Sequence, residues 1–248
     1  MFDTYGEIFA VRAGSYQHAM EKMPHARDRE FLAMIEPLGD IAGGTLCDMP
    51  AGGGYLHRYL PPGVRYIAVE PSAIFISRCP QGLDCQAVQS PIEQVPLDSG
   101  SVDHIVSLAG LHHCPNLGSV FREMRRLVRT GGTVVIADVE EDTGPARFLN
   151  VYVDAHNPLG HRGTFLDGTT SRLLHEAGLK PVADELVEIP WRFDDARQAG
   201  IYCMALFGLE GVSAENVAHA METYLGAFGG PGHCTVKWQL RRLICTAV

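Results

Sequence analysis

Positive charge is scarce in this chain of 248 residues, because 20 lysines and arginines stand against 29 aspartates and glutamates and the formal net charge is -9. Binding to a polyphosphate surface depends on clustered basic residues that release counterions. We therefore expect no nucleic-acid partner. The sequence also has no run of about 18 apolar residues, the length of a membrane span, and no basic segment followed by an apolar one at its start. We expect no membrane partner and a cytoplasmic protein.

Closely spaced cysteine pairs are also missing, because no Cys-x-x-Cys pattern occurs among the seven cysteines. This spacing fits neither a disulfide framework nor a cysteine metal site, and it is typical of a reducing compartment. What the chain does contain is 46% hydrophobic and 20% charged residues, enough to bury a sizeable core. The length favours one domain with an accessory insertion over two full domains.

Short apolar runs alternate with longer, helix-compatible segments in the middle of the chain. The runs predict buried parallel strands at 45–47, 66–69, 85–88, 105–108 and 133–137. Between the last two, residues 117–129 have helical apolar spacing, and Gly131 and Gly132 are expected to end that helix. Because parallel neighbours need a crossover, this alternation predicts an α/β fold with a doubly wound, mostly parallel sheet and helices on both faces.

The flanking segments predict a division into regions around this sheet. Residues 1–40 are expected to form an N-terminal helical cap and residues 41–193 the α/β core. Residues 194–231 are expected to form a helical insertion, which could be a lid, a subunit interface of a homodimer or a cover for one sheet face. Residues 232–248 would complete the core with an antiparallel C-terminal strand.

Polar and small residues follow several predicted strands, at the sheet edge where open parallel sheets bind ligands. Asp48 and the turn at 50–54 follow the first run, Glu70 follows the second, and His112 and His113 follow the fourth. These residues are therefore the candidate site.

The glycine-rich turn could in principle belong to a dinucleotide site, which also has an acid about 20 residues later. His57, however, stands at the third position of the Gly-x-Gly-x-x-Gly pattern, where a glycine or alanine is needed. Asp48 at the mouth of the turn would repel a pyrophosphate and attract an ammonium group. The turn therefore favours a cationic ligand without phosphate over NAD(P).

Several segments occur in the order of the motifs of one family. They are residues 45–54, 66–72, 93–103, 111–113 and 126–132. Together they resemble the class I S-adenosylmethionine-dependent methyltransferases, in the small-molecule branch related to the ubiquinone and menaquinone methyltransferases. The resemblance implies a Rossmann-like enzyme that moves a methyl group from S-adenosyl-L-methionine to a small-molecule acceptor by in-line displacement. That cofactor carries an ammonium group and a sulfonium and has no phosphate.

The resemblance also implies roles for residues of the first two motifs. Asp48 would hold the methionine amino group, and Glu70 would accept hydrogen bonds from both ribose hydroxyls. Ala51, Gly52 and Gly54 would let the backbone approach the cofactor. The alternative is that Asp48 caps the following helix and that Glu70 is a surface charge.

Other residues complete the expected cofactor site. Pro71 or Ser72 would line the adenine, and Ser90 or the backbone of Ile92 would replace an acid that the family often has for the adenine amino group. Pro50 departs from the family pattern as well, because it replaces the first glycine of the turn. Ala109, at the end of the fourth strand, is a further candidate.

The cap could contribute to the same site. Tyr5, Arg12 and Tyr16 would reach the methionine carboxylate.

His113 and His112 are the candidate catalytic residues, because a general base is needed if the acceptor must lose a proton. The alternative is that they shape the pocket. Asp154, His156 and His161 could form a metal or second base cluster, but loop histidines are usually just polar, so we expect no metal. Two other functions stay open: a non-catalytic S-adenosylmethionine-binding or scaffold protein, and an NAD(P)-dependent oxidoreductase.

Overall fold

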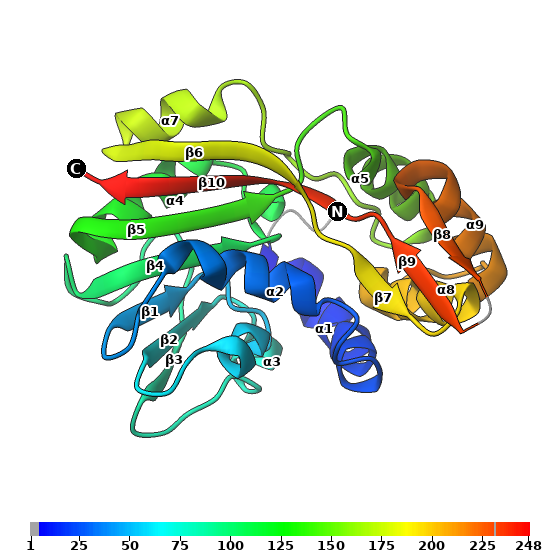
Figure 1. Cartoon of the computed structure of the whole chain (residues 1–248), viewed down its shortest axis with the longest axis horizontal. Helices are drawn as coiled ribbons and strands as arrows, with labels where there is room; N and C mark the ends of the chain where they lie inside the picture. Colours follow the sequence, from blue (N-terminus) through cyan, green and yellow to red (C-terminus); the bar gives the residue numbers. More distant parts are fainter. Residues whose placement is uncertain (1–4, 231) are drawn as a thin grey trace.

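A seven-stranded sheet in the order β3-β2-β1-β4-β5-β10-β6 forms the centre of the computed structural model, which describes residues 5–230 and 232–248 (Figure 1). Its strands are β1 Thr45–Asp48, β2 Arg65–Glu70, β3 Cys85–Gln89, β4 Val102–Leu108, β5 Val128–Asp138, β6 Leu179–Glu188 and β10 Gln239–Ala247. Strands β1 to β5 run parallel to one another, and β10 is antiparallel to both β5 and β6. The predicted mostly parallel sheet with an antiparallel C-terminal strand is confirmed.

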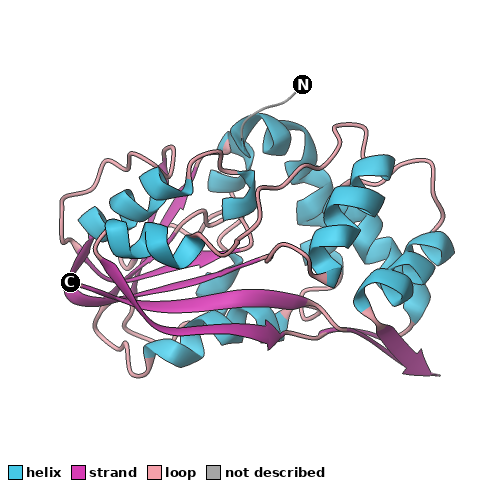
Figure 2. Cartoon of the chain, turned by 90° about the horizontal axis from the view of Figure 1, so that it is seen from above, coloured by secondary structure: helices cyan, strands magenta, loops and turns pink. Residues whose placement is uncertain are grey.

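Helices cover both faces of this sheet (Figure 2). Successive residues of a strand point to opposite faces, so Leu46 belongs to one apolar cluster and Cys47 to the other. Both faces of the sheet are therefore buried in an apolar cluster, which explains why the strands appear in the sequence as nearly continuous apolar runs. The helices nearest the sheet are α2 Asp28–Ile35, α3 Ala73–Ile76, α4 Leu117–Leu127 and α7 Thr170–Glu176, with short 3-10 turns at Glu36–Leu38, Tyr55–Tyr59 and Leu111–His113.

Helix α4 ends earlier than predicted. It stops at Leu127, two residues before Arg129, and β5 begins at once with Val128. Val128 pairs with Val102 of β4, which draws it into the sheet, and the register then shifts before the next pair. Gly131, with a φ of +78°, lies inside this irregular start of β5 and does not end the helix.

The N-terminal segment contains α1 Tyr5–Lys22 and α2, in keeping with the helical cap that the sequence predicts. After β5 the chain forms one irregular helix, with α5 Gly144–Arg147, a π-helical segment Phe148–Val153 and α6 Asp154–His156. Within the described residues, no helix is both long and apolar enough to cross a membrane.

A small lobe extends from the sheet and differs from the all-helical insertion predicted for 194–231. It contains α8 Ala196–Phe207 and α9 Ala214–Leu225, together with a three-stranded sheet in the order β7-β9-β8. These strands are β7 Trp191–Phe193, β8 Ala227–Gly230 and β9 His233–Val236. Because β6 leads directly into β7 and β9 leads into β10, the lobe continues two strands of the main sheet (Figure 1).

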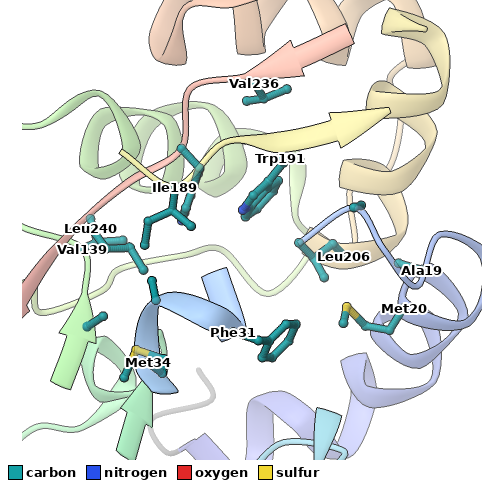
Figure 3. Packing of buried hydrophobic residues seen from close by; sticks show 14 of the residues in the cluster. Ala19, Met20, Phe31, Met34, Val139, Ile189, Trp191, Leu206, Val236 and Leu240 are labelled. Carbon is teal, nitrogen blue, oxygen red and sulfur yellow. The ribbon is translucent and has the colours of Figure 1, made fainter. Parts of the chain in front are cut away.

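The cap and the lobe share one apolar core (Figure 3). Phe31 of α2, Leu206 of α8 and Trp191 of β7 all belong to it and are at most 5% exposed. The Trp191 ring stacks on Trp238 with centroids 4.5 Å apart, and its indole nitrogen donates a hydrogen bond to Glu30 at 3.1 Å. The lobe is thereby packed against α2 and held beside the carboxyl edge of the sheet.

Candidate functional site

A cavity at the carboxyl ends of β1 and β4 is closed by α1 and α2; we call it the Asp48 cavity. It is lined by Phe9, Tyr16, Arg27, Phe31, Asp48, Pro50, Ala51, Gly52, Tyr55, Leu56, Phe75, Leu108, Ala109 and Gly110. Five of the predicted cofactor residues are thus brought together: Tyr16, Asp48, Ala51, Gly52 and Ala109. They come from three distant parts of the chain, which the parallel sheet and the cap place side by side.

Asp48 is a buried acid with one side-chain donor in the described part of the chain. It is 4% exposed, and the Tyr66 hydroxyl donates a hydrogen bond to its Oδ2 at 2.7 Å. Burial raises the pKa of Asp48 to about 7, and the hydrogen bond from Tyr66 opposes that shift. A positive charge in the cavity would favour the ionised carboxylate. The helix-capping alternative finds no support in the hydrogen bonds of this side chain.

Glu70 is fully buried, so it is not a surface charge. Its Oε2 accepts the Gly52 N–H and its Oε1 accepts the Ser72 N–H, both at 2.8 Å. The carboxylate therefore joins the turn after β1 to the end of β2. A carboxylate oxygen can accept more than one hydrogen bond, and Glu70 holds the turn that lines the Asp48 cavity.

The two glycines of the turn differ in what they face. Gly52, with a φ of +54°, lines the cavity, as the prediction required. Gly54, with a φ of +71°, is absent from the described lining. A Cβ at Gly54 would lie 2.6 Å from the Pro80 side chain, so this glycine serves the close packing of the turn.

Four predicted adenine residues are not among the described residues that line the Asp48 cavity: Pro71, Ser72, Ser90 and Ile92. The Ser72 hydroxyl caps α3 by accepting the Phe75 N–H. The Ser90 hydroxyl donates to the backbone oxygen of Gln94 at 2.7 Å, and Ile92 is buried in an apolar cluster. The structure therefore gives these side chains local structural contacts.

Sequence reasoning missed the aromatic wall of the cavity. Phe75 of α3 packs against Phe9 and Tyr16 of α1, with ring centroids 5.1 and 5.4 Å apart. Phe75 stands five positions after Glu70, which could have drawn attention to it. Phe9 carried no signal, because an apolar residue in a helix usually serves the core.

A second cavity adjoins the first; we call it the histidine cavity. It is lined by Phe9, Arg12, Tyr16, Arg27, Glu30, Ala109, His112, His113, Val139, Leu149, His161, Trp191, Leu206, Phe207 and Trp238. Phe9, Tyr16, Arg27 and Ala109 line both cavities. Both predicted catalytic histidines therefore lie next to the predicted cofactor residues.

His112 is held in a fixed orientation by the last residue of β5. Its Nδ1 lies 2.7 Å from Asp138 Oδ1, and the Asp138 carboxylate also accepts the backbone N–H groups of Leu111 and Val139. A carboxylate partner requires a proton on Nδ1, so the lone pair of His112 is on Nε2. The pairing of Asp138 with His112 becomes visible only in three dimensions.

His161 is buried and His113 is half-buried, and both lie beside His112. Burial lowers the pKa of His113 well below its ordinary value, and His112, His161 and Arg12 lower it further. Burial likewise lowers the pKa of His161, with His112 and Arg12 acting in the same direction. Both rings are therefore neutral at neutral pH.

The loop cluster suggested by the sequence does not assemble. Asp154 accepts the His161 backbone N–H at 2.7 Å, and the His156 ring lies against Tyr152 with centroids 4.6 Å apart. His161 instead joins His112 and His113. Within the described part of the chain, these three form the one group of His, Cys, Asp or Glu side chains whose ligand atoms lie close together, within 4.8 Å of one another.

Polar atoms on the opposite wall of the histidine cavity are incompletely paired. Arg27 pairs with Glu30 and donates to the Tyr16 hydroxyl at 2.5 Å. Among the described residues, Glu30 Oε1 and Trp238 Nε1 have no hydrogen-bond partner although both atoms are buried. A buried acceptor and a buried donor left unpaired are costly unless a ligand or water satisfies them.

The side chain of Tyr5, also proposed for the cap, lies outside the described residues.

Comparison with known proteins places the central part of the chain beside a domain family. A family model described as a methyltransferase domain matches residues 47–136, the stretch that contains Asp48, Glu70, His112 and His113. The uncharacterized protein YafE of Escherichia coli (strain K12) is 27% identical over 108 residues, which cover 42% of this chain and 51% of that protein. The chain therefore matches about half the length of this curated relative.

Solved structures extend the likeness to the whole fold. The chain bound to the Haloferax volcanii Trm112 methyltransferase activator is 16% identical with a TM-score of 0.66, and the match covers 100% of this chain and 99% of that one. The geranyl diphosphate C-methyltransferase of Streptomyces coelicolor A3(2), solved with Mg²⁺, geranyl diphosphate and S-adenosyl-L-homocysteine, is 14% identical with a TM-score of 0.60. That match covers 94% of this chain and 85% of the Streptomyces protein.

Proposed function

We propose that this chain, which carries a class I S-adenosylmethionine-dependent methyltransferase domain, transfers the methyl group of S-adenosyl-L-methionine to a small-molecule acceptor. The observation that carries the proposal is the buried Asp48 carboxyl, which lines a cavity at the carboxyl end of β1. The adjoining histidine cavity supplies a place for the acceptor.

The Asp48 cavity suits the methionine end of the cofactor. An ammonium group beside Asp48 would compensate the burial of the carboxylate, since an opposite charge within hydrogen-bond distance favours the ionised form. Glu70 holds Gly52 in position, and a carboxylate at the end of β2 is the group proposed to accept hydrogen bonds from the ribose hydroxyls. For Tyr16, Ala51, Gly52 and Ala109, lining of the cavity supports the proposed cofactor contact.

The histidine cavity suits a compact acceptor with an aromatic or apolar body. Its walls include Trp191, Trp238 and Phe207, and two of its described polar atoms are an unpaired acceptor, Glu30 Oε1, and an unpaired donor, Trp238 Nε1. An acceptor molecule that offers one donor and one acceptor group would satisfy both. A cavity that needs one donor and one acceptor from its ligand supports a small molecule over a macromolecule as the methyl acceptor.

The residues of this chain contribute positioning and proton transfer, while the bound cofactor supplies an electrophilic methyl group. Holding donor and acceptor in line provides most of the acceleration that a methyl transfer needs. If the acceptor carries an acidic proton, His112 can accept it on Nε2, because Asp138 holds the Nδ1 proton. His113 lies beside it, with ring centroids 4.1 Å apart, and is proposed to orient the acceptor.

The assembly and location of the protein are proposals as well. Leu206 and Phe207 of α8 line the histidine cavity, which supports a covering role for the region 194–231. A homodimer, a cytoplasmic location and the absence of nucleic-acid or membrane partners remain predictions from the sequence.

Calorimetry with S-adenosylhomocysteine tests the cofactor site. We expect the full chain to bind it, and we expect Asp48→Asn and Glu70→Gln each to weaken binding by about tenfold or more, because a charge-assisted contact is lost. Asp84→Asn, which changes an exposed acid before β3, is the matched control and should bind normally. Unchanged affinity in both Asp48→Asn and Glu70→Gln would reject the assignment. Binding without methyl transfer to any of a broad panel of acceptors would favour a non-catalytic role.

A further inference from the structure

We propose that His112, His113 and His161 bind a divalent transition-metal ion at the wall of the histidine cavity, with one coordination position left open to the methyl acceptor. The inference deepens the proposed function, because it specifies how the acceptor would be held. Its starting observation is that the three imidazoles offer ligand nitrogens within 4.8 Å of one another. They come from the segment after β4 and from the loop after α6, so the fold brings them together from distant positions.

Two of the rings are oriented by hydrogen bonds on their far side. His112 donates from Nδ1 to Asp138 at 2.7 Å, and His161 pairs through Nδ1 with Asn150 Oδ1 at 3.1 Å. The same Asn150 oxygen accepts the Gly163 N–H at 3.0 Å, which identifies it as an acceptor and places the His161 proton on Nδ1. In both rings the Nε2 lone pair is then available to a ligand. Histidines that bind metals almost always have such a carboxylate or carbonyl partner.

The surrounding loop is shaped to hold His161 against His112. The Thr164 N–H donates to the His112 backbone oxygen at 2.8 Å. A Cβ at Gly163 would lie 3.2 Å from the His112 ring and 3.3 Å from the His161 ring, so glycine permits the close approach. The ring centroids of His161 lie 5.4 Å from those of both His112 and His113. The cluster is therefore built by backbone and side-chain contacts on several sides.

The ligand set favours zinc and its neighbours over magnesium or calcium. Imidazole nitrogen suits Zn²⁺, Co²⁺, Ni²⁺, Cu²⁺ and Fe²⁺, whereas Mg²⁺ and Ca²⁺ prefer oxygen. In a tetrahedral site with Zn–N bonds of about 2.0–2.1 Å, the three ligand nitrogens lie closer together than the limit of 4.8 Å found here. Small rotations of the rings would bring the nitrogens to that spacing. Three histidines and an open position are also the arrangement of a catalytic zinc site.

The open position determines the acceptor chemistry. It faces the cavity that shares Ala109, Phe9 and Tyr16 with the Asp48 cavity, so a group bound to the metal would lie next to the cofactor. A hydroxyl, thiol or amine of the acceptor would become more acidic on the metal and lose its proton to solvent. In the metal-loaded protein the His112 lone pair is occupied, so the metal replaces His112 in activating the acceptor.

Cobalt titration of the chelator-treated full chain tests the proposal. We expect one equivalent of Co²⁺ to bind and to show the visible absorption of a Co²⁺ site with few nitrogen ligands. In calorimetry, Zn²⁺ should displace the bound Co²⁺, whereas Mg²⁺ should not displace it. His161→Gln should weaken Co²⁺ binding by about a hundredfold, and Asn150→Ala by about ten- to a hundredfold, because both change the coordination directly or through its supporting hydrogen bond. His219→Gln is the control, because that side chain is 80% exposed on α9, and it should bind Co²⁺ like the unchanged chain.

Each outcome decides the proposal. Absence of Co²⁺ binding, or equal binding by His161→Gln and the unchanged chain, would overturn it. Because the Asp48 cavity does not include His161 among its described lining residues, His161→Gln should still bind S-adenosylhomocysteine, which verifies that the variant folds. Cofactor binding without Co²⁺ binding would overturn the metal site alone, and Co²⁺ binding without cofactor binding would overturn the proposed function alone.

Discussion

Asp48 and Glu70 are both buried acids at one sheet edge, yet their surroundings differ. Glu70 accepts two backbone N–H groups, so its charge is compensated within the protein. Among the described residues Asp48 accepts one side-chain hydrogen bond, from Tyr66, and burial raises the pKa of Asp48 to about 7. Asp48 therefore gains more than Glu70 from a positively charged ligand, and its ligand binding should depend on pH.

We predict that affinity for S-adenosylhomocysteine falls as the pH is lowered below about 7. Protonated Asp48 must lose its proton before it can pair with the ligand's ammonium group, so affinity should approach a loss of about tenfold per pH unit. Tyr66 stays protonated, because burial and Asp48 raise its pKa. Calorimetry between pH 5.5 and 8 measures the effect, and Asp48→Asn should remove the slope. A flat profile in the unchanged chain would contradict the role of Asp48.

The buried histidines predict an acid-sensitive stability. Because burial lowers the pKa of His161, the unfolded chain binds a proton below about pH 6.5 that the native chain does not. The free energy of unfolding contributed by this group is complete above that pH and declines as the pH falls.

Urea unfolding of the metal-free chain at pH 7, 6 and 5 measures this contribution. His161→Gln should lose less stability than the unchanged chain, by about 1.4 kcal/mol per pH unit below 6.5. Asp48 acts in the opposite direction, since its raised pKa makes the native state bind the extra proton, but it is common to both chains and cancels in the difference. Parallel pH profiles would show that His161 is not responsible.

At the scale of elements, the turn between β1 and the following 3-10 helix leaves little room for a side chain at Gly54. Gly54 has a φ of +71° and close neighbours at Cys79 and Pro80. Gly43 has a φ of +76° with no described atom within 4 Å of an added Cβ. The two glycines therefore share a backbone conformation and differ in available space.

We predict that Gly54→Ala destabilises the protein more than Gly43→Ala. Backbone strain should cost each variant about 1–2 kcal/mol, and the contact with Pro80 should add about 1–3 kcal/mol at Gly54 alone. Urea unfolding measures both changes. Equal losses of stability would mean that the turn moves to accommodate the methyl group.

The sequence predicted those elements whose pattern is local and repeated. The central strands are buried on both faces and appear as short apolar runs, and the residues after them, such as Asp48 and His112, belong to the site. The strands β7, β8 and β9 were missed, because three or four residues are too few to show an alternating pattern. The contacts of His161 were also missed, because they depend on how the loop after α6 packs against the segment after β4. The proposed adenine contacts of Ser90 and of the Ile92 backbone stay predictions, because they replace a family acid that this chain lacks; the Ser90 hydroxyl itself donates to the Gln94 backbone oxygen.

At the scale of the whole molecule, α1 covers both cavities. Phe9 and Tyr16 line each of them, and Arg12 donates to the Leu206 backbone oxygen of α8 at 3.2 Å. Ligand binding should therefore be coupled to the stability of α1.

Hydrogen exchange tests this coupling. We predict that S-adenosylhomocysteine slows exchange of the α1 amides, because a ligand beneath the helix adds contacts that oppose local opening. Helix α4, whose apolar side chains belong to the other face of the sheet, is the internal reference and should exchange at an unchanged rate. Equal exchange rates of the α1 amides with and without ligand would show that the stability of α1 is not coupled to ligand binding.

The continuity of β6 with β7 and of β9 with β10 has a consequence for how acceptor preference could change. Two strands anchor the lobe to the main sheet, so the wall that the lobe contributes to the histidine cavity is fixed in position. Helix α1, which forms another wall, is joined to α2 through the short stretch 23–27. Substitutions on the inner side of α1 should therefore broaden or narrow the range of molecules methylated while the sheet keeps its architecture.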